Sequence, residues 1–471
     1  MNRELQATGV ETRTRRLVRV ELGVLALGIG LRLYLALVNG EANDDHFAVI
    51  RIIADEHRVP GIRDAWEGFQ PKLYHVSVAA LWELSPLHSA GVQVRIAQLV
   101  SCAAGVATLL VVRQVLRRRG LSHPVAVLTF AFVALNPTLI GLNAQATNDS
   151  FVILFATIAL AQGVTFLRTG APRAFAAMTA SVTLAALSKG NGLVVFVALA
   201  VTMLVGFARS QSIPRLSRRR LFEHFAIFLV VFAVLVGALG AYRANYHDTG
   251  DPFAINGPRA PFPHLIEKTS VFRPGVESIA SGYFTFRFVD LIDHPWITNG
   301  HTASPRHRTS LWTQLYGRTN SVHFAQFPPS WASKSQLVLA VGRLAFVLAL
   351  LPTALLLIGM FTALKRLIAP DAESRFDDRR RLVELLLVLT AFGYVAFVVL
   401  YTLRYRDFST MKAEFLFPGL LAYACIFGDQ VQRAAEWSAP RPRVRAVGSA
   451  SLIALLGLYV VDATILAVQL T

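Results

Sequence analysis

Residues 222–242 read FEHFAIFLVVFAVLVGALGAY, an apolar run with two polar residues near its start. A helix needs about 20 apolar residues to cross the hydrocarbon core of a bilayer. Runs of similar length occur at Val20–Val38 and Val94–Leu116. Over the whole chain of 471 residues, 54% are hydrophobic and only 16% are charged, a balance that excludes an ordinary soluble domain. The sequence therefore predicts an all-α, polytopic membrane protein.

The apolar runs predict about eleven membrane spans. We expect them near residues 18–38, 93–116, 124–142, 150–168, 174–187, 191–208, 222–242, 336–364, 382–403, 413–430 and 447–468. One more apolar run, Leu73–Leu84, is too short to cross. At about 1.5 Å per residue it reaches roughly 18 Å, against about 30 Å of hydrocarbon.

The basic clusters decide how the spans are oriented. If Leu73–Leu84 does not cross and the N-terminus is cytoplasmic, every main cluster falls on the cytoplasmic side, as membrane proteins prefer. These clusters are Arg117–Arg119, Arg168 with Arg173, Arg209–Arg220, Lys365–Arg381 and Arg433–Arg445. We therefore interpret Leu73–Leu84 as an interfacial or re-entrant helix on the external side. The clusters also account for the net charge of +17, so no nucleic-acid partner is expected.

The spans divide the chain into three parts. Residues 1–242 form a transmembrane module with a first external loop at residues 39–86, residues 243–335 form a large external loop, and residues 336–471 form the C-terminal transmembrane helices. The large loop is longer than loops without a function usually are. We expect short helices and an interfacial segment within it.

The first external loop contains the motif Asn43-Asp44-Asp45-His46-Phe47. Ile50, Ile53 and His57 follow at helical spacing, which predicts an amphipathic juxtamembrane helix at the membrane surface. Asn43 is a good N-cap, and an acid in the first turn suits the helix dipole, so local structure accounts for one aspartate. It accounts less well for two acids and a histidine at the same place.

Further along this loop, Pro71 is expected to start a helix with Lys72 in its first turn. Free backbone N–H groups and a lysine at a helix start form an anion site. Lys72 and Tyr74 fit equally well as ordinary anchors at the membrane interface.

Later external segments carry further candidate residues. Asp149 begins a predicted span, where a carboxylate is costly and often functional, although a capped helix also favours an acid there. Three external cations, Arg404, Arg406 and Lys412, lie next to the bilayer. A phosphate diester held at the interface would need such groups, and lipid headgroups are their alternative partners.

In their order along the chain, these motifs resemble those of the GT-C superfamily of glycosyltransferases. That superfamily includes the protein O-mannosyltransferases and the lipid A aminoarabinose transferase. The stretches that carry the resemblance are Asp44-Asp45-His46-Phe47, Pro71-Lys72-Leu73-Tyr74, Thr147-Asn148-Asp149, Ser188-Lys189-Gly190-Asn191-Gly192, Gly250-Asp251-Pro252 and Glu414-Phe415-Leu416-Phe417-Pro418. Each is short, and their order and topology carry the weight.

The resemblance implies roles for particular residues. Asp44 is implied as the catalytic base, with Asp45 where the family usually has Glu, and Asp149 as a further catalytic acid. Because Asp is one methylene shorter than Glu, the division of roles between Asp44 and Asp45 stays open. The residues expected to bind substrate are His46, Lys72, Tyr74, Lys189, Arg404, Arg406, Lys412 and Glu414.

The implied activity is transfer of a sugar from a polyprenyl-phosphate donor to a hydroxyl of a glycan, lipid or protein acceptor, with inversion. It would take place on the external face of a bacterial inner membrane, among membrane lipids. No cofactor is expected. Suitable ligand types for a divalent metal are present, but their spacing matches no strong metal motif; they are Asp44, Asp45, His46 and either His57 or His75.

Two other classes of protein fit parts of the pattern. A transporter or lipid-linked glycan flippase would carry ionisable residues in mid-span and often shows internal repeats or broken helices. Here the acids gather on one external face and no repeat is evident. A membrane scaffold or receptor would tolerate loss of the acids, so a transfer assay with Asp44→Asn separates all three classes.

Overall fold

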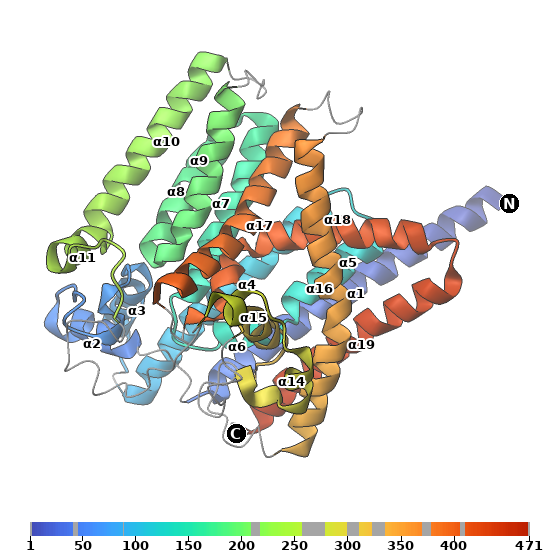
Figure 1. The fold of residues 1–471 in the computed structure, drawn as a ribbon, viewed down its shortest axis with the longest axis horizontal. Helices are drawn as coiled ribbons and strands as arrows, with labels where there is room; N and C mark the ends of the chain where they lie inside the picture. Colours follow the sequence, from blue (N-terminus) through green and yellow to red (C-terminus); the bar gives the residue numbers. More distant parts are fainter. Residues whose placement is uncertain are drawn as a thin grey trace.

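The computed structural model describes residues 2–40, 46–87, 89–208, 217–256, 278–298, 310–322, 335–369, 378–405 and 410–469. Within these ranges every regular element is a helix (Figure 1). Eight helices are long and apolar enough to cross a membrane: α1 (Asn2–Val38), α4 (Ala90–Arg117), α7 (Asp149–Thr169), α9 (Leu193–Ala208) with the 3-10 turn η2 (Gly190–Gly192), α10 (Arg218–Leu239), α16 (Gln336–Ile368), α17 (Asp378–Tyr405) and α19 (Pro442–Gln469). The predicted all-α membrane fold is confirmed.

The predicted count of eleven spans is not confirmed. Helices α5 (His123–Ala134) and α6 (Pro137–Asn143) form a pair bent by 51°, which makes nine spans among the described residues if the pair counts as one. The other two expected spans are α8 (Pro172–Ser188), with 17 residues, and α18 (Leu420–Ser438), which follows the 3-10 helix η8 (Ala413–Gly419). Helix α8 reaches only about 26 Å, and α18 carries Asp429, Arg433 and Glu436.

The bend between α5 and α6 has a local cause. Pro137 has no N–H and disfavours a helical conformation at the residue before it, so α5 ends and α6 starts anew, capped by Asn136. A carbonyl released by such a break needs a partner inside a membrane. Arg32 supplies it: the fully buried guanidinium donates to Ala134 O at 2.6 Å and to Asn143 Oδ1 at 2.9 Å. This arginine therefore has a structural role.

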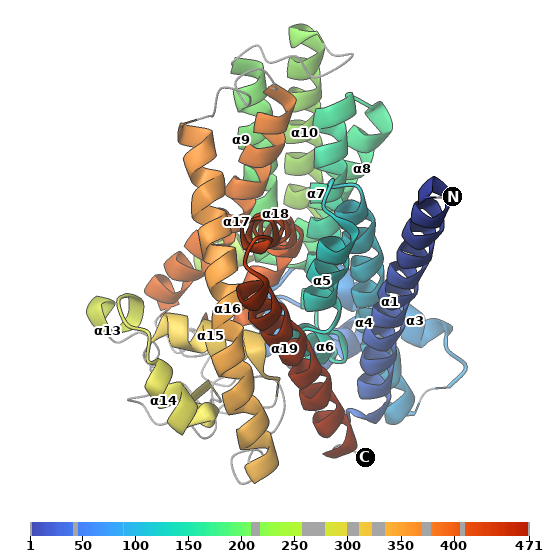
Figure 2. The same ribbon diagram turned by 90° about the vertical axis from the view of Figure 1, so that its right-hand side faces the viewer.

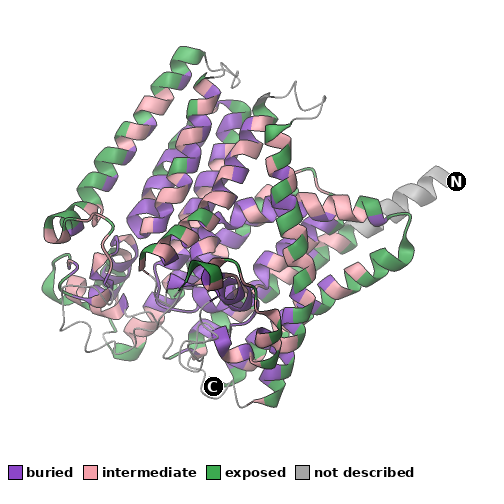
Figure 3. Cartoon of the chain, viewed as in Figure 1, coloured by how far each residue is buried: buried purple, intermediate pink, exposed green. Residues whose placement is uncertain are grey.

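Helix α7 lies at the centre of the bundle, packed against α4 and α8, while α17 packs against α9 and α16 against α18 and α19. Figure 3 shows the contrast between the buried faces of α7 and α8 and the exposed length of α10. The side chains exposed on α10 include Val230 and Val234, which suits contact with lipid. The central position of α7 fixes the residues at its start.

The two ends of the bundle differ in charge and in structure. The start of α1, the end of α9 with the start of α10, and the end of α16 with the start of α17 lie at one end (Figures 1 and 2). The arginines of Arg218–Arg220 and Lys365 with Arg366 belong to these helix ends. The opposite end holds α2 (His46–Glu56), α3 (Leu73–Leu84) and α11 (Tyr242–Thr249). The predicted cytoplasmic clusters on these helices thus share one end.

Short helices cover the other end of the bundle. The expected helix at Leu73–Leu84 has the predicted bounds. The large loop contains α13 (Ile279–Tyr283), α14 (Phe288–Asp293), η3 (Pro295–Thr298) and α15 (Leu311–Asn320), as expected. One prediction was wrong: α2 ends at Glu56, and His57 adopts a left-handed φ of 52°, so His57 does not continue the amphipathic helix.

Candidate functional site

The candidate site is built around the start of α7. Asp149 is the first residue of this helix and is 2% exposed. Thr147 Oγ1 donates to Asp149 Oδ2 at 3.0 Å, and Ser101 Oγ of α4 lies 3.2 Å from Thr147 O. The Tyr74 hydroxyl lies 3.3 Å from Ser101 Oγ and donates to Ala97 O at 2.9 Å. Asp149 is therefore held from α3 and α4 through a chain of hydroxyl groups.

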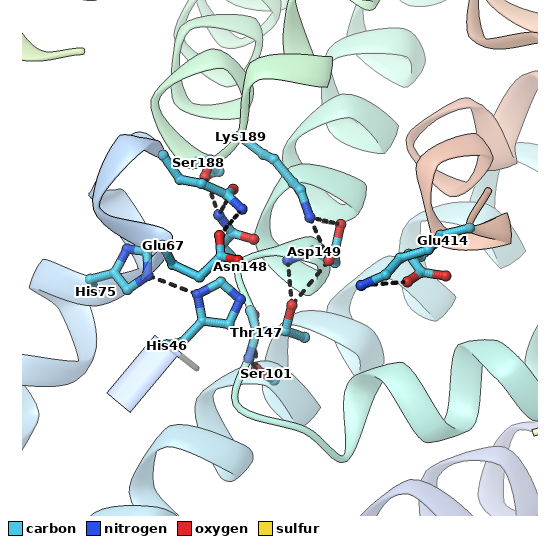
Figure 4. A network of polar contacts seen from close by, with 12 residues as sticks. His46, Glu67, His75, Ser101, Thr147, Asn148, Asp149, Ser188, Lys189 and Glu414 are labelled. Atoms are coloured by element: carbon cyan, nitrogen blue, oxygen red, sulfur yellow. Dashed lines mark hydrogen bonds and ion pairs between the residues drawn. The ribbon is translucent and has the colours of Figure 1, made fainter. Parts of the chain in front are cut away.

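Lys189 meets Asp149 from the end of α8. The helix ends at Ser188, and Lys189 follows in an extended conformation. Its ammonium lies 2.8 Å from Asp149 Oδ1 and 2.7 Å from Oδ2, as Figure 4 shows. The same ammonium lies 5.2 Å from the centre of the Phe415 ring in η8. Three segments far apart in the sequence thus converge on one cation.

A second polar network links the same helix ends to the first external loop. Asn148 Nδ2 donates to Ser188 O at 3.0 Å and to Gln70 Oε1 at 2.6 Å. Gln70 Nε2 donates in turn to the buried Glu67 carboxylate, drawn beside Asn148 in Figure 4. These contacts fix η1 (Trp66–Phe69) and the residues after it against α7 and α8.

The two other residues expected to bind substrate in this region are buried away from the cavity described below. His46 is fully buried, and its Nδ1 lies 2.9 Å from His75 Nε2, so one ring donates to the other. Burial and the neighbouring His46 ring hold the pKa of His75 well below its usual range. Tyr74 is also fully buried. The observed contacts give His46 and Tyr74 a role in joining α2, α3 and α4.

Lys72 lies just before α3, as expected, but its side chain turns back toward the preceding loop. Its ammonium donates to Gly68 O at 2.6 Å and to Gln70 O. Burial lowers its pKa to about 7, although Glu67 and Asp64 act in the opposite direction. Lys72 does not line the cavity described next.

A cavity of about 550 Å³ lies beside this network. Its polar lining includes Lys189, Arg404 and Lys412, all expected to bind substrate, together with Glu67 and Asn191. Its apolar wall comes from α9, α17 and η8 through Leu193, Val194, Phe397, Leu400 and Phe415. The segment Pro252–Asn256, which includes part of the Gly250-Asp251-Pro252 motif, closes another side. The cavity thus combines a cationic part with an apolar wall.

Each cation of the lining has a carboxylate partner. Arg404 pairs with Asp251, and Lys412 Nζ lies 3.5 Å from Glu414 Oε1. Glu414 itself is buried outside the lining, as is Asp149 behind Lys189. The predicted acidic residues Asp149 and Glu414 therefore contact the cavity through the lysines that they hold.

Three predicted site residues, Asp44, Asp45 and Arg406, lie outside the described residues. In the described part of the chain, no three His, Cys, Asp or Glu side chains gather as metal ligands would. His57 lies 3.4 Å from Glu83 and is separate from the His46–His75 pair. The metal candidates therefore do not come together in the residues that the structure places.

Two residues of the lining were not predicted as site residues. Glu67 is the one carboxylate among the lining residues that the structure describes, and Asn191 lies next to Lys189 in η2. Both belong to stretches beside predicted residues, Trp66–Lys72 and Ser188–Gly192. The sequence offered proximity to a motif as a signal, but no pattern that distinguishes a lining side chain from a buried one.

Comparison with known proteins adds an independent result. Residues 80–237 match the family described as dolichyl-phosphate-mannose-protein mannosyltransferase. This stretch runs from within α3 to near the end of α10 and includes Asp149 and Lys189. No curated protein matches the chain significantly.

Two solved structures have a similar arrangement of helices. ArnT from Cupriavidus metallidurans, bound to undecaprenyl phosphate, is 15% identical, with 89% of this chain and 79% of that chain covered and a TM-score of 0.38. The oligosaccharyltransferase of Archaeoglobus fulgidus, tethered with an acceptor peptide, is 12% identical, with 94% of this chain and 55% of that chain covered and a TM-score of 0.46.

The fold, the site and the family match define a class of protein. The predicted resemblance to GT-C membrane glycosyltransferases is confirmed, and the family match supports a glycosyltransferase of the GT-C type that uses a lipid-linked donor.

Proposed function

We propose that this chain transfers a sugar from a polyprenyl-phosphate donor to an acceptor hydroxyl at the external face of a bacterial inner membrane. The observation that carries this proposal is the cavity with three cations and an apolar wall. A polyprenyl phosphate has the same two characters, an anionic head and a hydrocarbon chain. The family match, whose description names a dolichyl-phosphate-linked sugar, supports a donor of this class.

The cations would bind the phosphate of the donor. Lysine and arginine form charge-assisted hydrogen bonds with phosphate oxygens, and arginine can bind two oxygens at once. Lys189 keeps its position through Asp149, and Lys412 is held near Glu414. As the sugar leaves, negative charge grows on the phosphate oxygen, and these cations would stabilise that charge.

The apolar wall would take the isoprenoid chain. Leu400 of α17 lines the cavity and is nevertheless 65% exposed. The apolar lining therefore continues to the outer surface of α17. In a membrane, that surface would face lipid, so a lipid-linked donor could keep its chain in the bilayer while its phosphate occupies the cavity.

The reaction would be a single displacement. The acceptor oxygen forms a bond to the anomeric carbon, the bond from that carbon to the phosphate oxygen breaks, and its electron pair leaves with the phosphate. A carboxylate takes the acceptor's proton. We propose Asp44 or Asp45 for this step, as the family resemblance implies, and one displacement predicts inversion at the anomeric carbon.

The proposed orientation follows from charge. The basic helix ends at the start of α10 and the end of α16 lie together, opposite α2, α3 and α11 (Figure 1). Basic residues favour the cytoplasmic side. The cavity would then open on the external side.

The test is a transfer assay with purified protein in lipid nanodiscs. Undecaprenyl phosphate carrying radiolabelled mannose, glucose or arabinose serves as donor, and membrane extract from the producing cells serves as the source of acceptor. We expect label to move from one of these donors to the extract with wild type, and not with Asp44→Asn. The matched control is Asp55→Asn, because Asp55 is exposed on α2. Equal transfer by Asp44→Asn and wild type would overturn the assignment of the base, and no transfer with any donor would contradict the proposed reaction with these sugars.

A further inference from the structure

The side chain of Asn191 lines the cavity with no partner for either of its polar atoms. It is 3% exposed, and neither Oδ1 nor Nδ2 has a hydrogen-bond partner in the described part of the chain. Buried polar groups are normally satisfied, and leaving one without a partner costs about 1–3 kcal/mol. A buried amide without partners at the wall of a cavity indicates that a ligand supplies them.

The backbone holds this amide in place. Asn191 is the middle residue of η2, and Gly192 N donates to Lys189 O at 2.9 Å. A Cβ at Gly192 would lie only 2.5 Å from the carbonyl of Ala185, so the turn packs directly against the backbone of α8. Lys189, two residues before Asn191, is fixed by Asp149. The position of Asn191 relative to the cation is therefore set by packing on both sides.

Asn256 provides a contrast on the same cavity. Its Nδ2 lies 2.7 Å from Trp66 O and 3.1 Å from both Ile62 O and Ala65 O. That amide is committed to holding the loop around η1 in place. Asn191 makes no such contact with the described protein, so structure alone does not account for it.

The chemistry of the amide selects the kind of ligand. A side-chain amide offers N–H donors and an oxygen acceptor. The oxygens of a phosphate diester only accept, so a phosphate would leave Oδ1 without a partner. A hydroxyl group both donates and accepts and can satisfy the two ends of the amide. The phosphate already has the cations Lys189, Arg404 and Lys412 on the cavity wall.

We infer that Asn191 binds a hydroxyl group of the sugar carried by the polyprenyl-phosphate donor. This inference rests on the proposed function and adds a sugar subsite to it. Because Asn191 and Lys189 share one turn, the sugar lies next to the phosphate, as it must when the two are joined by one oxygen. Glu67 and Gln70 line the same cavity and bring further polar atoms to it.

The test compares two ligands with no acceptor present. Binding of undecaprenyl phosphate, and of undecaprenyl phosphate bearing mannose, glucose or arabinose, is measured in nanodiscs for wild type, Asn191→Leu and Asn191→Ser. Leucine has a similar volume to asparagine and lacks both polar functions. The control is Gln114→Leu, because Gln114 is exposed on α4 and does not line the cavity.

We expect Asn191→Leu to bind the preferred sugar-bearing lipid about tenfold more weakly or worse, with the affinity for undecaprenyl phosphate unchanged. Its thermal stability without ligand should equal or exceed that of wild type, because a buried amide without partners is removed. If Asn191→Leu fails to fold, the comparison uses Asn191→Ser.

Other outcomes overturn the inference in distinct ways. Equal losses for the lipids with and without sugar would assign Asn191 to the phosphate or to the fold. Unchanged binding of both would leave the amide without a role in the donor. If wild type binds undecaprenyl phosphate and none of the sugar-bearing lipids, the sugar subsite is contradicted while phosphate binding stands. If wild type binds none of these lipids, the proposed function itself fails.

Discussion

The ammonium of Lys189 lies 2.7 and 2.8 Å from the two carboxylate oxygens of Asp149. The side chains are only 10% and 3% exposed, and the residues come from the end of α8 and the start of α7. The pair joins two motifs, Thr147-Asn148-Asp149 and Ser188–Gly192, into one site (Figure 4). It orients the lysine that lines the cavity, so its charge balance affects both stability and binding.

Removing one partner of this buried pair should destabilise the protein more than removing both. Asp149→Leu leaves the Lys189 ammonium buried and unpaired, which costs about 3–5 kcal/mol. The double variant Asp149→Leu/Lys189→Met replaces both charges with apolar groups and should recover most of this loss. Thermal unfolding in detergent measures stability, and the transfer assay should show both variants inactive. Additive losses of stability in the double variant would contradict the coupling.

Arg404 should matter for binding and little for stability. Its pair with Asp251 is half-exposed, and pairs of this kind contribute about 1 kcal/mol or less. Arg404→Gln should therefore unfold within a few degrees of wild type but bind undecaprenyl phosphate about tenfold more weakly, because one phosphate contact is lost. The control is Arg219→Gln at the other end of the bundle, where Arg219 pairs with Glu223 on α10. Unchanged affinity in Arg404→Gln would remove this residue from the phosphate site.

Lys72 predicts a pH dependence of stability. Its pKa falls from an ordinary value of 10.5 to about 7 in the folded chain, because burial penalises the charge. Between these two values the unfolded chain binds more protons than the folded chain, so the free energy of unfolding should rise with pH from about 7 to 10.5. Lys72→Met should weaken this rise. Unfolding midpoints of wild type and variant across pH 7–10 provide the measurement, and parallel curves would contradict the shift.

Gly192 should not tolerate a side chain, whereas Gly190 should. A Cβ at Gly192 would lie 2.5 Å from the backbone of Ala185, while a Cβ at Gly190 has no atom within 4 Å. Gly192→Ala should lower the unfolding temperature and the transfer rate, because η2 must move away from α8 and takes Lys189 and Asn191 with it. Gly190→Ala should keep the unfolding temperature of wild type. Equal stabilities of the two variants would contradict the close approach.

The helical membrane class and several element bounds followed from the sequence because they depend on local properties. The length of an apolar run decides whether it can cross, so Leu73–Leu84 was correctly excluded as a span and has the predicted bounds. Proximity of the charge clusters in the folded bundle also followed from their regular placement between spans. The exact number of spans did not follow, because run length alone overestimates helices such as α8 and α18.

The candidate site depended on the tertiary structure. The sequence brought forward Asp149, Lys189, Arg404 and Lys412 by type and position, but the pairing of Asp149 with Lys189 requires α7 and α8 to pack side by side. Nothing in the local sequence states that Lys72 turns toward backbone carbonyls rather than into a cavity.

The sequence by itself determined that this protein is a helical membrane protein with cations and acids gathered toward one end, because hydropathy and charge act residue by residue along the chain. Only the tertiary structure decided which of those side chains share a cavity and which hold their neighbours. The direction of a side chain depends on how its helix is rotated and on what packs against it, and those contacts join residues such as Gln70 and Asn148, 78 positions apart.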